Sequence, residues 1–181
     1  MFNLFRRKHT YTCACCGETF TGSPSRAFLK PPFYFDVPEA EREARITIDS
    51  DLCHIRGETE DCDIFAIRVT LDIPIHGEDD PFTWGVWVTQ SRANFERYRD
   101  SAGADRSSVT TFGWLPVVMP HYDRASTDGP FENLACDVHW GAEGLRPKIV
   151  LHESDHPLYL DQRDGISWDH AIAIVHPKSA N

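Results

Sequence analysis

Hydrophobic and polar residues alternate most clearly over residues 63–75, DIFAIRVTLDIPI. The hydrophobic side chains occupy every second position, at Phe65, Ile67, Val69, Leu71 and Ile73. Because successive side chains of a strand point to opposite faces, this pattern predicts a strand whose odd-numbered residues face a core. Residues 45–55, RITIDSDLCHI, are also strand-like, and the GETEDC sequence that follows favours a hairpin between the two segments.

Further segments rich in β-branched and aromatic residues predict more strands. They are FTWGVWVTQ (82–90), VTTFGWLPVVMP (109–120), LACDVHW (134–140), RPKIVLHES (146–154) and LYLDQ (158–162). Gly113 and Pro116 interrupt the second of these segments, which suits an edge strand or a bulge.

Three segments have helical signals. Residues 38–45, PEAEREAR, begin with a proline and are mostly charged, which predicts a short surface helix. Ser91 is the expected N-cap of a helix over 91–100, with Phe95 and Tyr98 at helical spacing. Ser167 is the expected N-cap of the segment WDHAIAIVH. The chain therefore predicts an α+β fold, with a mostly antiparallel sheet and about three peripheral helices.

A chain of 181 residues with 41% hydrophobic residues is long enough for one domain with a substantial core. We expect a flexible basic N-terminus over residues 1–10, one domain over 11–176 and a tail over 177–181. No apolar run approaches the roughly 18 residues of a membrane span, and the N-terminus lacks the order of an export signal. These features predict a cytoplasmic protein whose cysteines are reduced.

The formal net charge of −10 bears on the choice of partner. A field of this sign repels phosphate backbones and disfavours nucleic-acid binding. It serves solubility, and it also suits an acidic surface that meets a basic protein partner.

The sequence CACCG places three of the six cysteines within four positions. Cys13 and Cys16 have the C-x-x-C spacing of a zinc knuckle, which supplies half of a four-ligand site. The best-spaced second half is Cys136 with His139, although residues three apart on a regular strand face opposite sides and a bulge at Asp137 would be required. Rival donors are Cys15, Cys53, His54 and Cys62.

Two other interpretations of the knuckle remain open. The cysteines can be turn thiols without a metal, or a redox-sensing pair with an exposed, low-pKa thiol at Cys13 or Cys15. The redox interpretation is weakened because no helix start follows the motif.

Histidines offer the main catalytic alternative. His152 and His156 form H-E-S-D-H, but the hydrophobic strand before it and Pro157 after it do not fit a metalloprotease helix, so His156 is expected to be structural. The sequence has no nucleophile elbow, phosphate-cradling loop or dinucleotide fingerprint. This favours a non-catalytic protein, and the alternative is a metal-dependent, hydrolase-like enzyme that uses His139 and His156.

Aromatic residues mark a candidate binding surface at Trp84, Trp87 and Trp114, together with His156. Trp84 and Trp87 are three apart on a predicted strand, so one should lie in the core while the other needs a cover. That cover is a partner, a ligand or the helix over 91–100.

Several motifs together resemble a bacterial family, the domain of unknown function 2199. They are CACCG (13–17), SDLC (50–53), FAIRV (65–69), WGVWVTQSRANFERY (84–98), FGWL (112–115), GLRPKIVL (144–151) and DHPLYLDQRDGI (155–166). The resemblance implies the domain limits and the fold but no mechanism. The family pattern has a histidine three residues after CxxCG, where this chain has Phe20.

Taken together, the sequence predicts a binding protein, for example an inhibitor or immunity-type protein for a basic partner, with a structural zinc at the knuckle.

Overall fold

The structure is a computed structural model that describes residues 9–12, 17–122 and 131–175. Its α-helices are α1 (Glu39–Arg45), α2 (Arg92–Asp100), α3 (Pro157–Asp164) and α4 (Trp168–Val175). Its strands are β1 (Thr10–Thr12), β2 (Thr19–Thr21), β3 (Ser25–Ala27), β4 (Ile46–Ile48), β5 (Leu52–Ile55), β6 (Ile64–Ile73), β7 (Phe82–Gln90), β8 (Thr110–Pro116), β9 (Asn133–His139) and β10 (Lys148–Leu151). The expected α+β class is confirmed, and most strand pairs are antiparallel.

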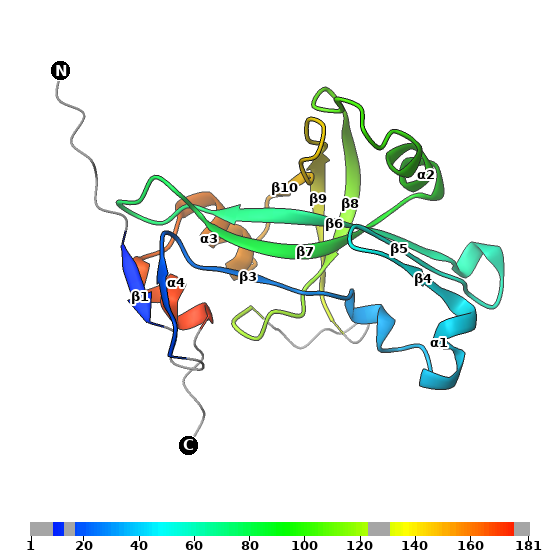
Figure 1. Cartoon of the computed structure of the whole chain (residues 1–181), viewed down its shortest axis with the longest axis horizontal. Coiled ribbons are helices and arrows are strands. Elements are labelled where there is room, and N and C mark those ends of the chain that lie inside the picture. The colour runs from blue at the N-terminus through cyan, green and yellow to red at the C-terminus, as the bar shows by residue number, and fades with distance from the viewer. Residues whose placement is uncertain (1–8, 13–16, 123–130, 176–181) are drawn as a thin grey trace.

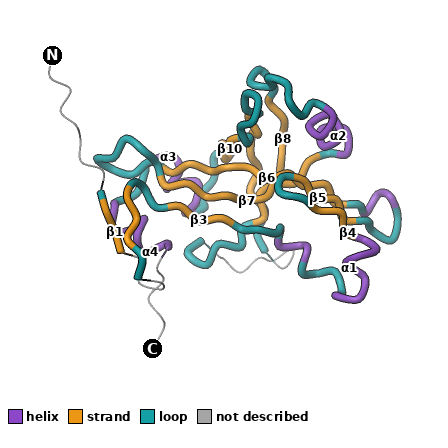
Figure 2. The backbone as a smooth tube through the Cα atoms, viewed as in Figure 1, coloured by secondary structure: helices purple, strands orange, loops and turns teal. Residues whose placement is uncertain are grey.

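The large sheet has the order β3-β7-β8-β9-β10-β6-β5-β4. β6 also pairs with β7, so the five strands from β6 to β10 form a closed ring of pairings. The ring is held by long ladders at β6–β7 and β8–β9, but by a single register pair at β7–β8 and another at β10–β6. In Figure 2 the long strands β6 and β7 cross the middle of the molecule, with β4 and β5 to one side.

The alternation that predicts β6 is confirmed. Phe65, Ile67, Val69, Leu71 and Ile73 are all buried in the main hydrophobic core. Strands β7, β8, β9 and β10 add their inward residues, and α2 adds Phe95 and Tyr98. The position of β8 differs from the expected edge, since it lies between β7 and β9, and Pro116 is tolerated because it is the last residue of the strand.

A second hydrophobic cluster covers the opposite face of β6 and β7. Trp84 lies in the main core, whereas Trp87 lies in this second cluster with Phe33 and Val37. The Trp87 indole N–H donates to the carbonyl oxygen of Phe28 at 3.1 Å. The two tryptophans therefore face opposite sides, as expected, but the cover over Trp87 comes from the segment between β3 and α1 and not from α2.

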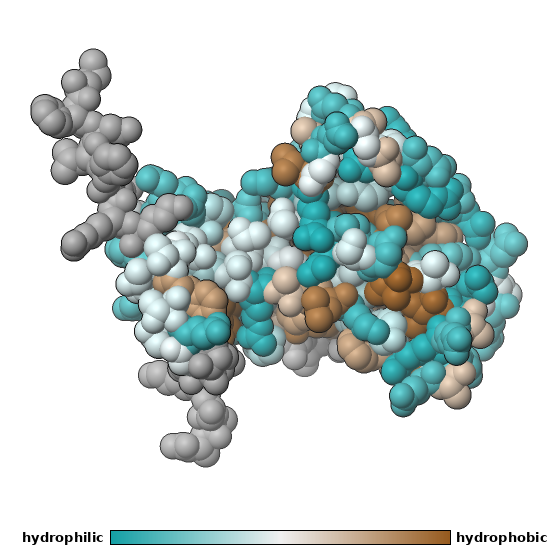
Figure 3. Space-filling view, in the orientation of Figure 1, coloured by the Kyte–Doolittle hydropathy of each residue, from teal (hydrophilic) through white to brown (hydrophobic). Residues whose placement is uncertain are grey.

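The same covering segment leaves some hydrophobic surface in solvent. Leu29 and Phe35 are largely exposed, and Phe35 lies edge-on to Tyr34 with a centroid separation of 5.3 Å. Figure 3 shows hydrophobic residues on this face, in the region where the chain passes from β3 to α1.

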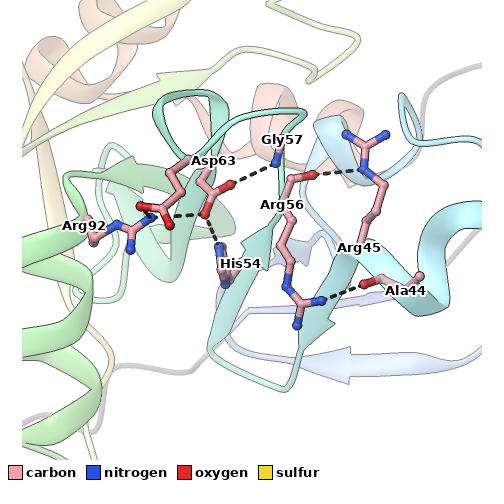
Figure 4. A network of polar contacts seen from close by, with 8 residues as sticks. Ala44, Arg45, His54, Arg56, Gly57, Asp63 and Arg92 are labelled. Carbon is pink, nitrogen blue, oxygen red and sulfur yellow. Dashed lines mark hydrogen bonds and ion pairs between the residues drawn. The ribbon is translucent and has the colours of Figure 1, made fainter.

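The connection between β5 and β6 is the expected hairpin, and Asp63 holds it together (Figure 4). One carboxylate oxygen of Asp63 accepts from the backbone N–H of Gly57 at 2.9 Å, and the other is 2.8 Å from His54 Nε2. Arg92, the first residue of α2, is 3.3 Å from the same carboxylate. The hairpin loop is therefore tied to the start of α2.

The sequence predicts one strand-like segment over residues 45–55, but in the structure these residues form two short strands, β4 and β5. The Asp49 carboxylate accepts from the backbone N–H groups of Asp51 and Leu52, both at 2.8 Å. Such a local bond lets aspartate stabilise a turn, so the segment folds back as the β4–β5 hairpin.

The capping predictions are confirmed for two helices. The Ser91 hydroxyl accepts from Asn94 N–H at 3.2 Å, and the Ser167 hydroxyl accepts from His170 N–H at 3.1 Å. Helix α1 has no buried residue, in agreement with a surface helix.

Helix α3 replaces the strand expected over 158–162. His156 is its N-cap and accepts from Leu158 N–H at 3.1 Å through Nδ1, while Pro157 occupies the first helical turn. Gly165 ends the helix with a φ of 80°.

The first and last described elements lie at the same end of the molecule (Figure 1). His9 lies edge-on to Trp168 of α4 at 4.6 Å between ring centroids, and Arg26 of β3 donates to the Ile174 carbonyl at 3.1 Å. None of the described helices is both long and apolar enough to cross a bilayer.

Candidate interaction surface

Strands β8, β9 and β10 have an outer face that points away from the core. Register places Phe112, Asp137 and Val150 in one row across the three strands. Trp114 and Ala135 lie in the next row. Because alternate residues of a strand share a face, Phe112 and Trp114 are neighbours on the surface. We call Phe112, Trp114, Asp137, Val150 and His152 the β8–β10 face.

This face exposes large hydrophobic side chains. Phe112 and Trp114 are each 46% exposed and Val150 is 51% exposed. The two aromatic rings meet edge-on with centroids 5.1 Å apart, and Phe112 also contacts the His152 ring at 5.7 Å. Rings that support one another hold a fixed shape, which lowers the entropy lost when a partner binds.

The centre of the β8–β10 face carries a carboxylate. Asp137 Oδ1 is 3.0 Å from His152 Nε2, and half of the aspartate side chain remains exposed. The neighbouring cation, Lys148, is paired with the Asp72 carboxylate at 2.6 Å. The Lys148 charge is therefore paired within the molecule, whereas among the described residues Asp137 has an ion-pair contact with His152 alone.

A buried hydrogen-bond network lies beneath the aromatic pair. The Gln90 side chain donates to the Phe112 carbonyl at 3.0 Å, and the Thr111 hydroxyl donates to Gln90 at 2.8 Å. Trp140 Nε1 donates in turn to the Thr111 hydroxyl at 3.1 Å. These bonds join β7, β8 and the end of β9, which fixes β8 at the point where it has only one register pair with β7.

The sequence identified only part of this surface. Of the four residues that the sequence suggests for a binding surface, Trp114 lies on this face, but Trp84 and Trp87 are 0% and 2% exposed, and His156 is fully buried as the cap of α3. These three residues are therefore core or capping residues and contribute no outer surface. Phe112 and Val150 could not be assigned to an outer face from the sequence. Their neighbours Thr111, Gly113 and Ile149 do not form a regular alternation of polar and apolar residues that would indicate which side chains point outward.

The second half of the predicted zinc site is not formed on β9. Cys136 is fully buried and its thiol donates to the Gly113 carbonyl at 3.4 Å, whereas His139 is exposed on the other face and contacts the Thr110 hydroxyl at 3.1 Å. No bulge at Asp137 brings them together, since β9 is in continuous register with β8. Cys13, Cys15 and Cys16 lie outside the described residues, so metal binding by the knuckle stays a prediction.

The remaining metal donors are also scattered. Cys53 is buried in the second cluster, while Cys62 is exposed in the β5–β6 connection. Burial raises the pKa of both Cys53 and Cys136 to about 12, with smaller contributions from the nearby Asp49 and Asp137 respectively. Within residues 9–12, 17–122 and 131–175, no three histidine, cysteine or acidic side chains form a group that could hold a metal.

The histidines of the catalytic alternative are far apart. His139 ends β9, whereas the buried His156 ring lies near the start of this strand, with Nε2 at 3.7 Å from Glu132. Seven strand residues separate the two ends by roughly 20 Å. His139 and His156 therefore do not share one cation site.

A family model described as "Uncharacterized protein conserved in bacteria (DUF2199)" matches residues 12–166. The chain belongs to this family. The resemblance noted from the sequence motifs is thereby confirmed. The family match covers the ring strands, α2 and α3, and it assigns no activity to them. No curated protein and no solved structure matches the chain.

Proposed function

We propose that the protein is a binding protein that docks a basic protein on the β8–β10 face. The observation that carries the proposal is the adjacent pair of half-exposed aromatic rings, Phe112 and Trp114, on the open face of a sheet. Aromatic residues are enriched in the centres of protein interfaces, where they bury large areas with few rotatable bonds.

Charge selects the class of partner. The chain has a formal net charge of −10, and Asp137 stands between Phe112 and Val150 in the register. A partner with lysine or arginine beside an apolar contact would neutralise Asp137 and be attracted from a distance. An inhibitor of a basic enzyme or toxin is one protein of this kind.

The proposal can be tested by site-specific photo-crosslinking in cells. A photoreactive phenylalanine analogue replaces Phe112, and in a matched control it replaces Phe35, which is 64% exposed on the covering segment. We expect position 112, and not position 35, to crosslink one protein whose isoelectric point is well above 7. Crosslinks to a second copy of this chain, to the chain itself or to acidic proteins would contradict the proposal.

The purified partner then allows a quantitative test. Trp114→Ser is expected to weaken binding by at least tenfold, because truncation of a central aromatic residue commonly costs about 2 kcal/mol or more. Asp137→Lys should weaken binding further and reduce its dependence on salt. Leu29→Ser, at a 77% exposed site away from this face, is the control and should bind as the wild type does.

A further inference from the structure

A second site lies beside α2, apart from the β8–β10 face. A cleft of about 660 Å³ is bounded by the turn before β5, the end of α2 with the loop after it, and the loop before β10. Its walls carry three arginines, Arg99, Arg106 and Arg146, and the ring of Tyr98. This volume lies within the range of about 300–1,000 Å³ that is usual for small-molecule sites.

Arg106 is the unusual member of this wall. The residue is only 8% exposed, its guanidinium carbon is 4.2 Å from the centroid of the Tyr98 ring, and Nη1 donates to the Tyr98 carbonyl at 3.1 Å. Its buried Nε has no acceptor, and no carboxylate lies within ion-pair distance in the described part of the chain. A buried guanidinium always carries its charge, so the absence of a counterion is costly unless a ligand supplies one.

The other arginines of the cleft already have carboxylate partners. Arg146 Nε is 2.5 Å from Asp51, and Arg99 binds Asp100 through two nitrogens at 2.7 and 3.2 Å. Burial alone would raise the pKa of Asp51, but hydrogen bonds from Ser50 and Arg146 outweigh it and hold the pKa below its usual value. Asp51 therefore stays ionised and is committed to Arg146.

Two further residues bear on the charge of the cleft. Asp49 also lines it, but one oxygen of this carboxylate is held by the amides of Asp51 and Leu52. Arg68, next to Ser50, has a buried Nε without an acceptor among the described residues, and its Nη1 is 3.5 Å from the Ser50 carbonyl. Arg68 does not itself line the cleft, but the lining carries three arginines against two aspartates, Asp49 and Asp51, so positive charge is in excess there.

Tyr98 adds a neutral donor. Burial raises the pKa of its phenol, although the nearby Arg106 opposes part of this effect, so the hydroxyl keeps its proton at neutral pH. Leu52 and Leu145 complete the lining with apolar surface. The cleft lining therefore combines arginine side chains with apolar surface that suits an organic body.

We propose that this cleft binds a small organic anion whose phosphate or carboxylate group pairs with Arg106. Guanidinium groups suit both oxyanions because their planar N–H groups match the oxygen spacing. The net charge of the chain opposes anions at long range, so the attraction comes from the local arginines. The proposal is independent of protein docking on the β8–β10 face.

Isothermal titration calorimetry on the full chain, at fixed ionic strength, tests the proposal with three probes. Adenosine monophosphate presents a phosphate on an organic body, citrate presents carboxylates, and inorganic phosphate presents the anion alone. We expect saturable binding of adenosine monophosphate or citrate, and weaker binding of inorganic phosphate. The organic probe that binds more tightly distinguishes the phosphate from the carboxylate, and failure of all three overturns the proposal.

Two variants and a control locate the site. Arg106→Gln is expected to weaken binding about tenfold or more, the usual effect of losing a hydrogen bond to a charged group. If this variant fails to fold, Ala102→Glu gives the same test, because Ala102 is exposed and lines the cleft. Arg163→Gln removes an equal charge from the exposed Arg163–Asp164 pair on α3 and should bind as the wild type does. Equal weakening in Arg163→Gln, or none in the cleft variants, overturns the proposal.

Discussion

At the scale of single residues, buried polar side chains determine how β8 is held. Gln90 and Thr111 are both almost completely buried and bond to one another, to the Phe112 carbonyl and to Trp140. Each group in this hydrogen-bond network depends on its neighbour. Loss of the Thr111 hydroxyl therefore leaves two buried groups, the Gln90 oxygen and the Trp140 N–H, without that partner.

Thr111→Val should therefore lower the free energy of unfolding by about 1–3 kcal/mol, because the Gln90 oxygen and the Trp140 N–H lose their partner. Urea denaturation monitored by tryptophan fluorescence measures the change. Thr110→Val is the matched control, since Thr110 is exposed on the outer face, and it should shift stability by less than about 0.5 kcal/mol. Equal effects in the two variants would show that the network contributes nothing specific.

The described cysteines should differ sharply in reactivity. Cys62 is exposed, whereas Cys53 and Cys136 are buried with pKa values raised to about 12 by burial. At pH 8 we expect iodoacetamide to alkylate Cys62 in the folded protein and to spare the other two, because the thiolate is the reactive form. Peptide mass spectrometry, with urea-unfolded protein as the control, checks this; native alkylation of Cys136 at the rate of Cys62 would contradict it.

At the scale of elements, the sequence predicted the helices and strands whose formation depends on residues close together in the chain. Strand β6 and the caps Ser91 and Ser167 could be predicted because periodicity and capping act within a few residues. The segment Leu158–Gln162 fits strand and helix equally by pattern, and α3 forms because His156 and Pro157 start a helical turn there.

Contacts between distant segments could not be predicted from the sequence. The cover over Trp87 comes from Phe28, 59 residues away, and the row that joins Phe112 to Val150 exists only through strand register. Trp114 was identified as a surface residue by its type, but Arg106 was missed. Its arginine neighbours in the cleft, Arg99 and Arg146, come from separate parts of the chain.

The β5–β6 connection has no space for a side chain at Gly57. A Cβ atom there would lie 2.4 Å from Cys62 Cβ and 2.6 Å from the Cys62 backbone, so a side chain cannot enter without moving the turn. Gly57→Ala should cost about 1–3 kcal/mol in unfolding free energy, measured by thermal or urea denaturation. Glu58→Ala, at the exposed next residue, is the control and should be nearly neutral. A neutral Gly57→Ala would show that the turn adjusts freely.

At the scale of the whole molecule, the described aspartates with shifted pKa values all shift in one direction. Hydrogen bonds lower the pKa of Asp63, Asp100, Asp105 and Asp164, and Asp51 is lowered despite its burial. For Asp63 the largest cause is the hydrogen bond from His54, followed by the one from the Gly57 amide. The unfolded chain therefore binds more protons than the folded chain in acid.

The stabilisation that these aspartates contribute should therefore be present above their ordinary pKa of about 4. It should be lost as the pH falls through the lowered pKa values of the folded protein. Urea denaturation at a series of pH values from 7 to 3 measures this decline. Asp63→Asn removes one of the shifted groups, so its curve should lie below the wild type at neutral pH and approach it in acid. A wild-type stability that stays constant down to pH 3 would contradict this account.

The closed ring of pairings limits how another protein can attach. The two ends of the large sheet are β3 and β4, and each has only three residues, so in the described part of the chain these two end strands leave little unpaired backbone. Such short borders protect against intermolecular strand addition and the aggregation that it starts. The proposed partner would then be recognised through side chains on an open face, where point substitutions can separate binding from folding.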